Sequence, residues 1–300
     1  MKFSFWTNTA HPWEEILFGA RHAEATGWDG LWVADHFMPN GADVSGPMHE
    51  GWTIATALGA SVPRVRVGVL VTGNTYRHPA VLAKMAATAD HVSGGRTVLG
   101  LGAGWQENEH RAYGIEFSSV GGRLDRLAEA CAVITLLLGR ERATYQGEHY
   151  QILDAPLEPK PLQSPLPLLI GGGGEQRTLR IAARFAQEWN VWGTPETLRH
   201  KIGVLERHCA DLDRDPAEIR HSAQALLFLC EDETSAASLR ERPMGMPTMI
   251  GTSEQLVELV GEYRDAGVDE LIIPDFTLPT GRAKADLMDR FITEVAAEFR

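Results

Sequence analysis

Short apolar runs alternate with longer segments of helical periodicity along the whole chain, and this alternation restricts the fold more than any other feature. Runs such as Val69–Val71 and Leu271–Ile273 have no polar position, which is typical of parallel strands buried on both faces. Eight segments of this kind are predicted to be strands: Lys2–Trp6, Gly30–Ala34, Arg66–Thr72, Thr97–Leu101, Leu166–Ile170, Glu188–Val191, His221–Leu229 and Glu270–Pro274.

The segments between and after these strands carry apolar residues at helical spacing. Start signals support two of them, because Thr194-Pro195 reads as a helix cap followed by proline, and Thr252 with Gln255 fits a capping box. The predicted helices are Trp13–Thr26, Gly51–Ser61, Ala80–Ser93, Leu124–Leu138, Gln176–Phe185, Pro195–Asp211, Ser253–Ala266 and Ala283–Phe299.

Strict alternation of strands and helices over 300 residues is typical of a (β/α)8, or TIM, barrel. No linker or change of composition divides the chain, so we expect one α/β domain over residues 1–300. A doubly wound open sheet is the alternative, since it alternates in the same way. In a barrel, active sites lie where the strands end at the C-terminal face, so the residues that follow each strand are the candidate site residues.

Composition excludes several classes of function. The chain has 28 basic and 40 acidic residues and a net charge of −12, which argues against a general nucleic-acid binder. Its cysteines, Cys131, Cys209 and Cys230, are far apart, so neither a disulfide framework nor a metal site is predicted. No apolar run approaches the ~20 residues of a membrane helix, and the first residues do not read as a signal peptide. We therefore expect a cytoplasmic protein.

Two connections are longer than the others. Residues Gly139–Pro165 contain Tyr145–Tyr150, which is predicted to form a small hairpin. Residues Cys230–Gly251 are rich in methionine and proline and are predicted to form a mobile loop.

Polar residues follow the second and third predicted strands. Asp35 and His36 place a carboxylate beside an imidazole at the barrel mouth, and such groups can donate and accept a proton near neutral pH. A loop cap with an incidental histidine is the alternative. Thr72, Gly73 and Asn74 combine hydrogen-bonding groups with a glycine that lets a flat ligand approach the backbone, although a plain turn has the same composition.

A run of small residues follows the fourth predicted strand. Gly100–Trp105 contains a GxGxG pattern, but a dinucleotide site would open directly into a long helix, and here Gly114 and Gly121 interrupt. The small residues are instead predicted to make room for a planar ring, with Asn108 pointing toward that ring.

The strongest single signal is Gly171, Gly172, Gly173 and Gly174, between a strand and a helix. Consecutive glycines expose their N–H groups, and the following helix N-terminus adds partial positive charge, so the segment is predicted to bind a phosphate. A flexible linker is the alternative, which fits poorly inside a compact barrel. The aromatic and polar residues of strands one and six are predicted to be core residues more often than ligand contacts: Trp6, Asn8, His11, Trp189 and Trp192.

Four stretches that together reach across nearly the whole chain resemble the luciferase-like monooxygenase superfamily, specifically its branch of deazaflavin-dependent (coenzyme F420-dependent) oxidoreductases. They are Gly27–Phe37, Gly68–Phe117, Pro167–Asn190 and Gly251–Pro274. The resemblance implies a (β/α)8 barrel with the cofactor ring over the strand ends, a homodimer, and hydride transfer between F420 and a small organic substrate.

The same resemblance assigns roles to individual residues. Asp35 and His36 match the pair beside the deazaflavin ring, and the histidine is the base in members that oxidise a hydroxyl. Leu70–Gly73, which includes Val71, matches a bulged strand end that supports the ring, where relatives have a cis peptide bond that does not precede proline. Asn108 matches a cofactor contact, and Gly171–Gly174 match the phosphate site.

One departure concerns the reaction. Trp105 stands where sugar-phosphate dehydrogenases of this family carry a catalytic glutamate, so a reductase reaction is as compatible with the sequence as alcohol oxidation. An FMN-dependent monooxygenase that uses O2 and a non-catalytic flavin-binding protein are the alternatives. A set of basic residues is expected near the mouth, where it would suit the acidic tail of F420 unless these are ordinary solvated residues: Arg77, Lys84, Arg177, Arg180 and Arg184.

Overall fold

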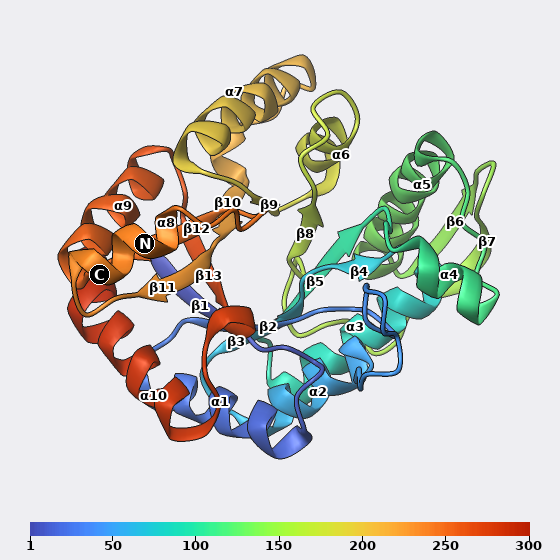
Figure 1. The fold of residues 1–300 in the computed structure, drawn as a ribbon. Helices are drawn as coiled ribbons and strands as arrows, with labels where there is room; N and C mark the ends of the chain where they lie inside the picture. The colour runs from blue at the N-terminus through green and yellow to red at the C-terminus, as the bar shows by residue number, and fades with distance from the viewer.

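Eight parallel strands close into a barrel in the computed structural model, which describes residues 1–300 (Figure 1). Each strand pairs in parallel with the next around the ring, and β3 pairs with β5 to close it. This closure excludes the doubly wound open sheet. In order around the ring, the strands are β1 (Lys2–Trp6), β2 (Gly30–Val33), β3 (Arg66–Val69), β5 (Thr97–Gly102), β8 (Leu168–Gly171), β9 (Glu188–Trp192), β10 (Arg220–Gln224) and β13 (Glu270–Pro274).

The helices surround the barrel (Figure 1). The bounds of α1, α2 and α7 agree with the prediction. The last predicted helix, Ala283–Phe299, is an α-helix only as far as Arg290, and a π-helix follows over Phe291–Val295. None of the helices is long and apolar enough to cross a membrane. The helices are α1 (Trp13–Thr26), α2 (Gly51–Ser61), α3 (Pro79–Ser93), α4 (Glu107–Tyr113), α5 (Val120–Gly139), α6 (Thr178–Phe185), α7 (Pro195–Asp211), α8 (Glu233–Arg240), α9 (Ser253–Asp265) and α10 (Gly281–Arg290).

The core has two layers because barrel side chains alternate between the lumen and the helices. The larger cluster, of 63 buried residues, includes Trp28, Trp52 and Trp189. The smaller one is formed by Trp6, Trp32, Leu70, Val98, Leu169 and Ile272. At the amino ends of the strands, Arg66 bridges two buried carboxylates, those of Glu188 at 2.5 Å and Glu270 at 3.3 Å. The lumen is thus sealed at its amino end and opens at its carboxyl end.

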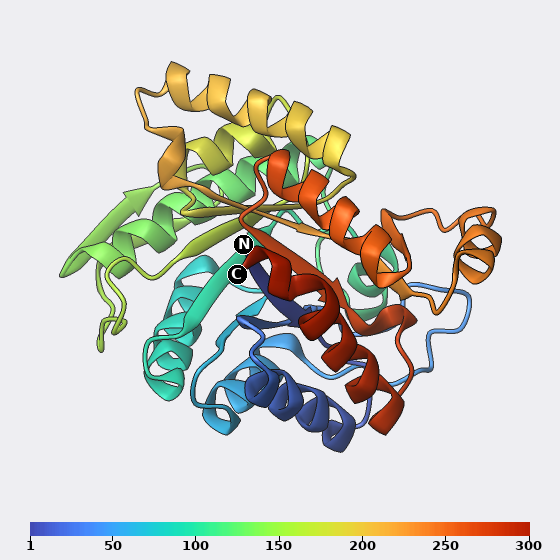
Figure 2. The same ribbon diagram turned by 90° about the vertical axis from the view of Figure 1, so that its left-hand side faces the viewer.

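The hairpin prediction is confirmed, because β6 (Arg142–Gln146) and β7 (Gln151–Pro156) pair antiparallel. The prediction of a mobile loop at Cys230–Gly251 is wrong. That segment holds α8 and β12 (Thr248–Gly251), and β12 pairs with β11 (Leu226–Leu229) outside the barrel sheet. Helix α8 buries only Ala236, so its hydrophobic periodicity is too weak to indicate a helix. In Figure 2 this segment (orange) and the hairpin (green) project on opposite sides of the barrel.

The two ends of the chain meet at the face of the barrel where the strands begin. The Met1 ammonium group donates to the carbonyl oxygen of Phe299 at 2.9 Å, and both views show the termini together (Figures 1 and 2). The first strand and the last helical segment therefore hold one another in place.

Candidate active site

A cavity of about 880 Å³ opens at the carboxyl ends of the strands, the face where the sequence predicts the site. The ends of β1, β2, β5, β8 and β9 all contribute lining residues, as does β4 (Thr72–Gly73), which follows a bulge after β3. The cavity is large enough for a cofactor together with a small substrate.

The bulge places Val71 in the middle of this mouth. The peptide bond between Leu70 and Val71 is cis, as the family resemblance implies. A Cβ atom added at Gly102 or at Gly171 would lie 2.8 Å from a Val71 methyl carbon. These glycines therefore make room for Val71, and both also line the cavity themselves.

The residues after Val71 divide between the cavity and the core. Thr72 and Gly73 line the cavity, and the Thr72 hydroxyl accepts a hydrogen bond from the Trp52 indole at 2.9 Å. Asn74 does not line it, because its amide donates to the Tyr150 hydroxyl at 3.3 Å. Of the predicted set Val71, Thr72, Gly73 and Asn74, the first three meet in the cavity.

Asp35 is held in a buried ion pair. The Arg77 guanidinium donates to both of its carboxylate oxygens, at 2.7 and 2.8 Å, and the Gly73 amide donates at 3.2 Å. Burial raises the pKa of the Asp35 carboxyl, and the Arg77 charge opposes the rise. Arg77 also pairs with Glu50. Asp35 therefore joins the end of β2 to the bulge, and it makes no hydrogen bond with His36.

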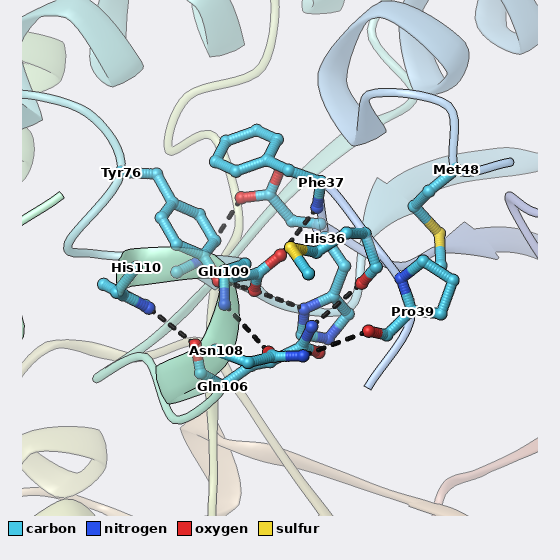
Figure 3. Close-up of polar contacts among 12 residues, drawn as sticks. His36, Phe37, Pro39, Met48, Tyr76, Gln106, Asn108, Glu109 and His110 are labelled. Atoms are coloured by element: carbon cyan, nitrogen blue, oxygen red, sulfur yellow. Dashed lines mark hydrogen bonds and ion pairs between the residues drawn. The ribbon is translucent and has the colours of Figure 1, made fainter. Parts of the chain in front are cut away.

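His36 has a different carboxylate as its partner. Its Nδ1 lies 2.8 Å from Oε1 of Glu109, a fully buried side chain of α4 (Figure 3). Glu109 also accepts hydrogen bonds from the Phe37 amide at 2.7 Å and from the Tyr76 hydroxyl. A carboxylate at this place makes Nδ1 the donor, so Nε2 is the nitrogen left for other partners. His36 lines the cavity, and its side chain keeps 22% of its exposure.

The protonation of this group follows from its contacts. Burial alone would raise the pKa of Glu109, but the hydrogen bonds from His36, Phe37 and Tyr76 outweigh it and lower the pKa below the usual range. Burial together with Glu109 raises the pKa of Tyr76, which keeps that hydroxyl a donor. The site thus holds an ionised, buried carboxylate behind the histidine, an arrangement suited to stabilising an imidazolium.

Sequence reasoning missed Glu109 and Tyr76 as site residues. Glu109 is 73 residues from His36, on a seven-residue helix that the sequence analysis did not predict. The only local signal is that a glutamate follows shortly after the small residues of β5, which ends at Gly102.

Asn108, the neighbour that was predicted, is turned away from the cavity. Its amide donates to the carbonyl oxygen of Pro39 at 3.2 Å and accepts from the Glu109 amide at 2.8 Å (Figure 3). The prediction that Asn108 points toward a ring is therefore wrong, and the helix turn that presents Glu109 to His36 is the reason.

The glycine segment lies where a phosphate site is expected. Gly171, Gly172 and Gly174 line the cavity, whereas Gly173 packs behind it against Val191. The N–H groups of Gly173 and Gly174 donate to no protein acceptor. Helix α6 begins at Thr178. Thr178 also lines the cavity, although the sequence did not indicate it as a site residue. Free amides beside a helix N-terminus are the usual setting of a bound anion.

The predicted cluster of basic residues does not form, because its members are paired elsewhere and none lines the cavity. Arg77 binds Asp35, Arg177 donates to the Gly121 carbonyl at 3.1 Å, and Arg180 lies 3.9 Å from Asp211. Lys84 donates to the Glu158 carbonyl, and Arg184 lies over the Phe185 ring.

The aromatic residues separate into core and cavity residues. Trp6 and Trp192 line the cavity with ring centroids 5.9 Å apart. Trp189 is fully buried, and its indole donates to the Gly172 carbonyl at 2.9 Å, so it supports the glycine segment from behind. Asn8 lines the cavity, whereas His11 lies 3.3 Å from Asp275, outside it.

Together these features define a class: a (β/α)8 barrel with one large cavity at the carboxyl ends of its strands, a glycine segment, and a carboxylate-backed histidine. The chain belongs to the luciferase-like monooxygenase family, whose family model matches residues 1–247.

Known relatives agree with this class. Residues of this chain are 37% identical, over 183 residues, to an F420-dependent glucose-6-phosphate dehydrogenase of Microbacterium testaceum, covering 59% of this chain and 51% of that protein. The chain spans about half the length of the curated relatives it matches first. Among solved structures, an F420-dependent secondary alcohol dehydrogenase in complex with an F420-acetone adduct has a TM-score of 0.85 at 21% identity, covering 98% of both chains. A monooxygenase from Streptomyces bottropensis has a TM-score of 0.83 at 18% identity, covering 100% of both chains.

Proposed function

We propose that this chain is an oxidoreductase that transfers a hydride between coenzyme F420 and a small organic substrate. The observation that carries the proposal is the buried Glu109–His36 pair, which engages Nδ1 and leaves Nε2 without a protein partner at the cavity. A protein that only bound a flavin would need no such pair. The relatives named F420-dependent dehydrogenases support the choice of cofactor.

The residues present fit such a cofactor. Val71, Thr72 and Gly73 would support the ring, since they line the cavity where the chain crosses its mouth. The free amides of Gly173 and Gly174, with the N-terminus of α6, would receive the phosphate group. The amides of Asn74 and Asn108 donate to Tyr150 and to the Pro39 carbonyl, and neither residue lines the cavity, so the proposed cofactor site leaves them out.

The deazaflavin ring, when bound, supplies the carbon that accepts or donates the hydride. His36 Nε2 is the group of this chain that takes up or releases the accompanying substrate proton. Glu109 stabilises the charged form of the imidazole and fixes its orientation. Asp35 and Arg77 hold the bulge on which the ring would rest, and they exchange no proton with the substrate.

The test is a titration of the purified chain with F420 and with FMN, followed by absorbance and fluorescence. We expect F420 to bind at least tenfold more tightly, or about 1.4 kcal/mol. Turnover should proceed unchanged under air with no oxygen uptake. Tighter binding of FMN with stoichiometric oxygen consumption would make the protein a monooxygenase, and binding without any turnover would make it a flavin-binding protein.

We further propose that the protein is a cytoplasmic homodimer. The dimer follows from the family resemblance, and light scattering coupled to size-exclusion chromatography would measure it. A reducing compartment is supported by Cys131, Cys209 and Cys230, which are all buried and free.

A further inference from the structure

The cavity mouth has two chemically different halves. Around the barrel, the bulge after β3, the end of β5 and the glycine segment after β8 are neighbours, and they form the half proposed above for the cofactor. The opposite half is made by the ends of β1, β9, β10 and β13, which provide Trp6, Trp192, Gln224 and, just after β13, Phe276. Trp6 is the centre of this group, 5.1 Å from the Phe276 ring and 5.9 Å from the Trp192 ring, measured between centroids.

Methionines also line the cavity. Met38 and Met48 come from the segment after β2, and Met246 comes from the segment between α8 and β12. Their unbranched thioether side chains adapt to ligands of different shape. The cavity can therefore bind apolar groups of different shapes.

The strand ends that form this half contribute no charged residue to the cavity lining. The charged residues among the cavity lining are Asp35 and Arg123, besides the titratable His36. Asp35 is neutralised by Arg77. Arg123 donates to the carbonyl oxygens of Gly104, at 3.1 Å, and Ser118, and its guanidinium lies 3.9 Å from the centre of the Phe117 ring. A phosphate or carboxylate bound here would lose its hydration without gaining a counter-charge, which costs several kcal/mol.

Two polar atoms in the same half are left without partners. Trp6 Nε1 and Gln224 Oε1 are buried and make no hydrogen bond, and both residues line the cavity. Trp6 is 7% exposed and Gln224 is 3% exposed. Unpaired buried polar groups are uncommon and call for a partner. A donor and an acceptor together suit a neutral hydroxyl or carbonyl compound.

We infer that the substrate is an uncharged, mainly apolar organic molecule with a hydroxyl or carbonyl group. It lies against Trp6, Trp192 and Phe276, and Trp6 and Gln224 orient it. This inference rests on the proposed function and narrows it, because it excludes the sugar phosphates that the relatives' names mention. Trp105, which follows β5 on the cofactor side, packs edge-on against His36 with centroids 5.4 Å apart and adds apolar surface to the same cavity.

Two ligands of nearly the same shape test whether the cavity prefers an uncharged substrate. Cyclohexyl methyl ketone and cyclohexanecarboxylate differ mainly in that a methyl group replaces a charged oxygen. Their dissociation constants would be measured by isothermal titration calorimetry on the purified chain, with and without F420. We expect the ketone to bind at least tenfold more tightly than the carboxylate. Equal or tighter binding of the carboxylate, or of glucose 6-phosphate, would overturn the inference.

The same titrations separate this inference from the proposed function. If F420 binds and the ketone is not preferred, the substrate class is wrong and the cofactor proposal stands. If the ketone is preferred and F420 does not bind, the substrate class stands and the cofactor proposal fails.

Two variants test the orienting contacts. Trp6→Phe and Gln224→Leu should each weaken ketone binding roughly 3- to 10-fold, the loss expected for one hydrogen bond. Trp28→Phe is the matched control, because Trp28 Nε1 is also buried without a partner but lies in the layer between sheet and helices. Its ketone affinity should be unchanged. If Trp28→Phe weakens binding as much as Trp6→Phe does, the orienting role is refuted.

Discussion

Replacing Glu109 by glutamine tests the carboxylate-backed histidine most directly. The variant keeps the size of the side chain but removes the charge that accepts from His36 Nδ1, the Phe37 amide and Tyr76. A hydrogen bond to a charged group contributes about 1.5–3 kcal/mol. If that stabilisation of the imidazolium is lost in the transition state, kcat should fall roughly 10- to 150-fold.

The assay is steady-state turnover with F420, together with the dissociation constant of F420 measured by fluorescence. We expect kcat to fall while F420 affinity changes less than threefold, since Glu109 does not line the cavity. Glu107→Gln is the control on the same helix, because Glu107 is exposed and pairs only with Arg111. An unchanged kcat in a folded Glu109→Gln protein would refute the role assigned to this carboxylate.

The loss of stability in Glu109→Gln should also depend on pH. The folded-state pKa of Glu109 is lowered, so its contribution to stability is present above its ordinary value of 4.5 and is lost as the pH falls through the folded-state pKa. The difference in melting temperature between the wild type and Glu109→Gln should therefore shrink as the pH is lowered below 4.5. A difference that stays constant from neutral pH into this range would show that Glu109 is not ionised in the folded protein.

Three further substitutions test the rest of the site. His36→Ala should lower turnover by about 10²- to 10⁴-fold with F420 affinity little changed; a fall only in proportion to lost cofactor binding would make His36 a binding residue. Gly174→Val should weaken F420 binding more than tenfold, because a Cβ there lies 2.8 Å from the Thr178 hydroxyl at the cavity wall; unchanged affinity would exclude a phosphate at this segment. Arg77→Leu should lower the free energy of unfolding by about 3–5 kcal/mol in a denaturant titration, since it leaves Asp35 buried and unpaired. A loss below 1 kcal/mol, of the order of a surface pair, would contradict the buried ion pair.

The strands and helices of the barrel could be predicted because their signals are local. Each needs only the spacing of apolar residues over 5 to 17 positions, as in β13 or α7, together with a cap such as Thr194 or Thr252. Where the local signal is weak, prediction failed. Helix α4 has only seven residues, and helix α8 buries only one residue, Ala236. Neither helix therefore shows apolar residues repeated at helical spacing.

The position of the candidate site was also readable, since a closed barrel brings every strand end to one face. That rule placed His36, Val71 and Gly171 at one mouth, and the structure has all of them lining one cavity. Their position follows from topology alone, so no knowledge of side-chain packing is needed.

The chemical partners were decided by the tertiary structure. His36 adjoins Asp35 in the sequence, yet its partner is Glu109, 73 positions away, while Asp35 pairs with Arg77, 42 positions away. Neighbouring residues at a strand end face different ways, so adjacency in sequence does not make a pair. Likewise, Gly102 and Gly171 are small because Val71 reaches across to them, and only the closed barrel brings these strands into contact. Local periodicity therefore determines the scaffold and the face that carries the site, whereas contacts between distant segments determine which side chains act together.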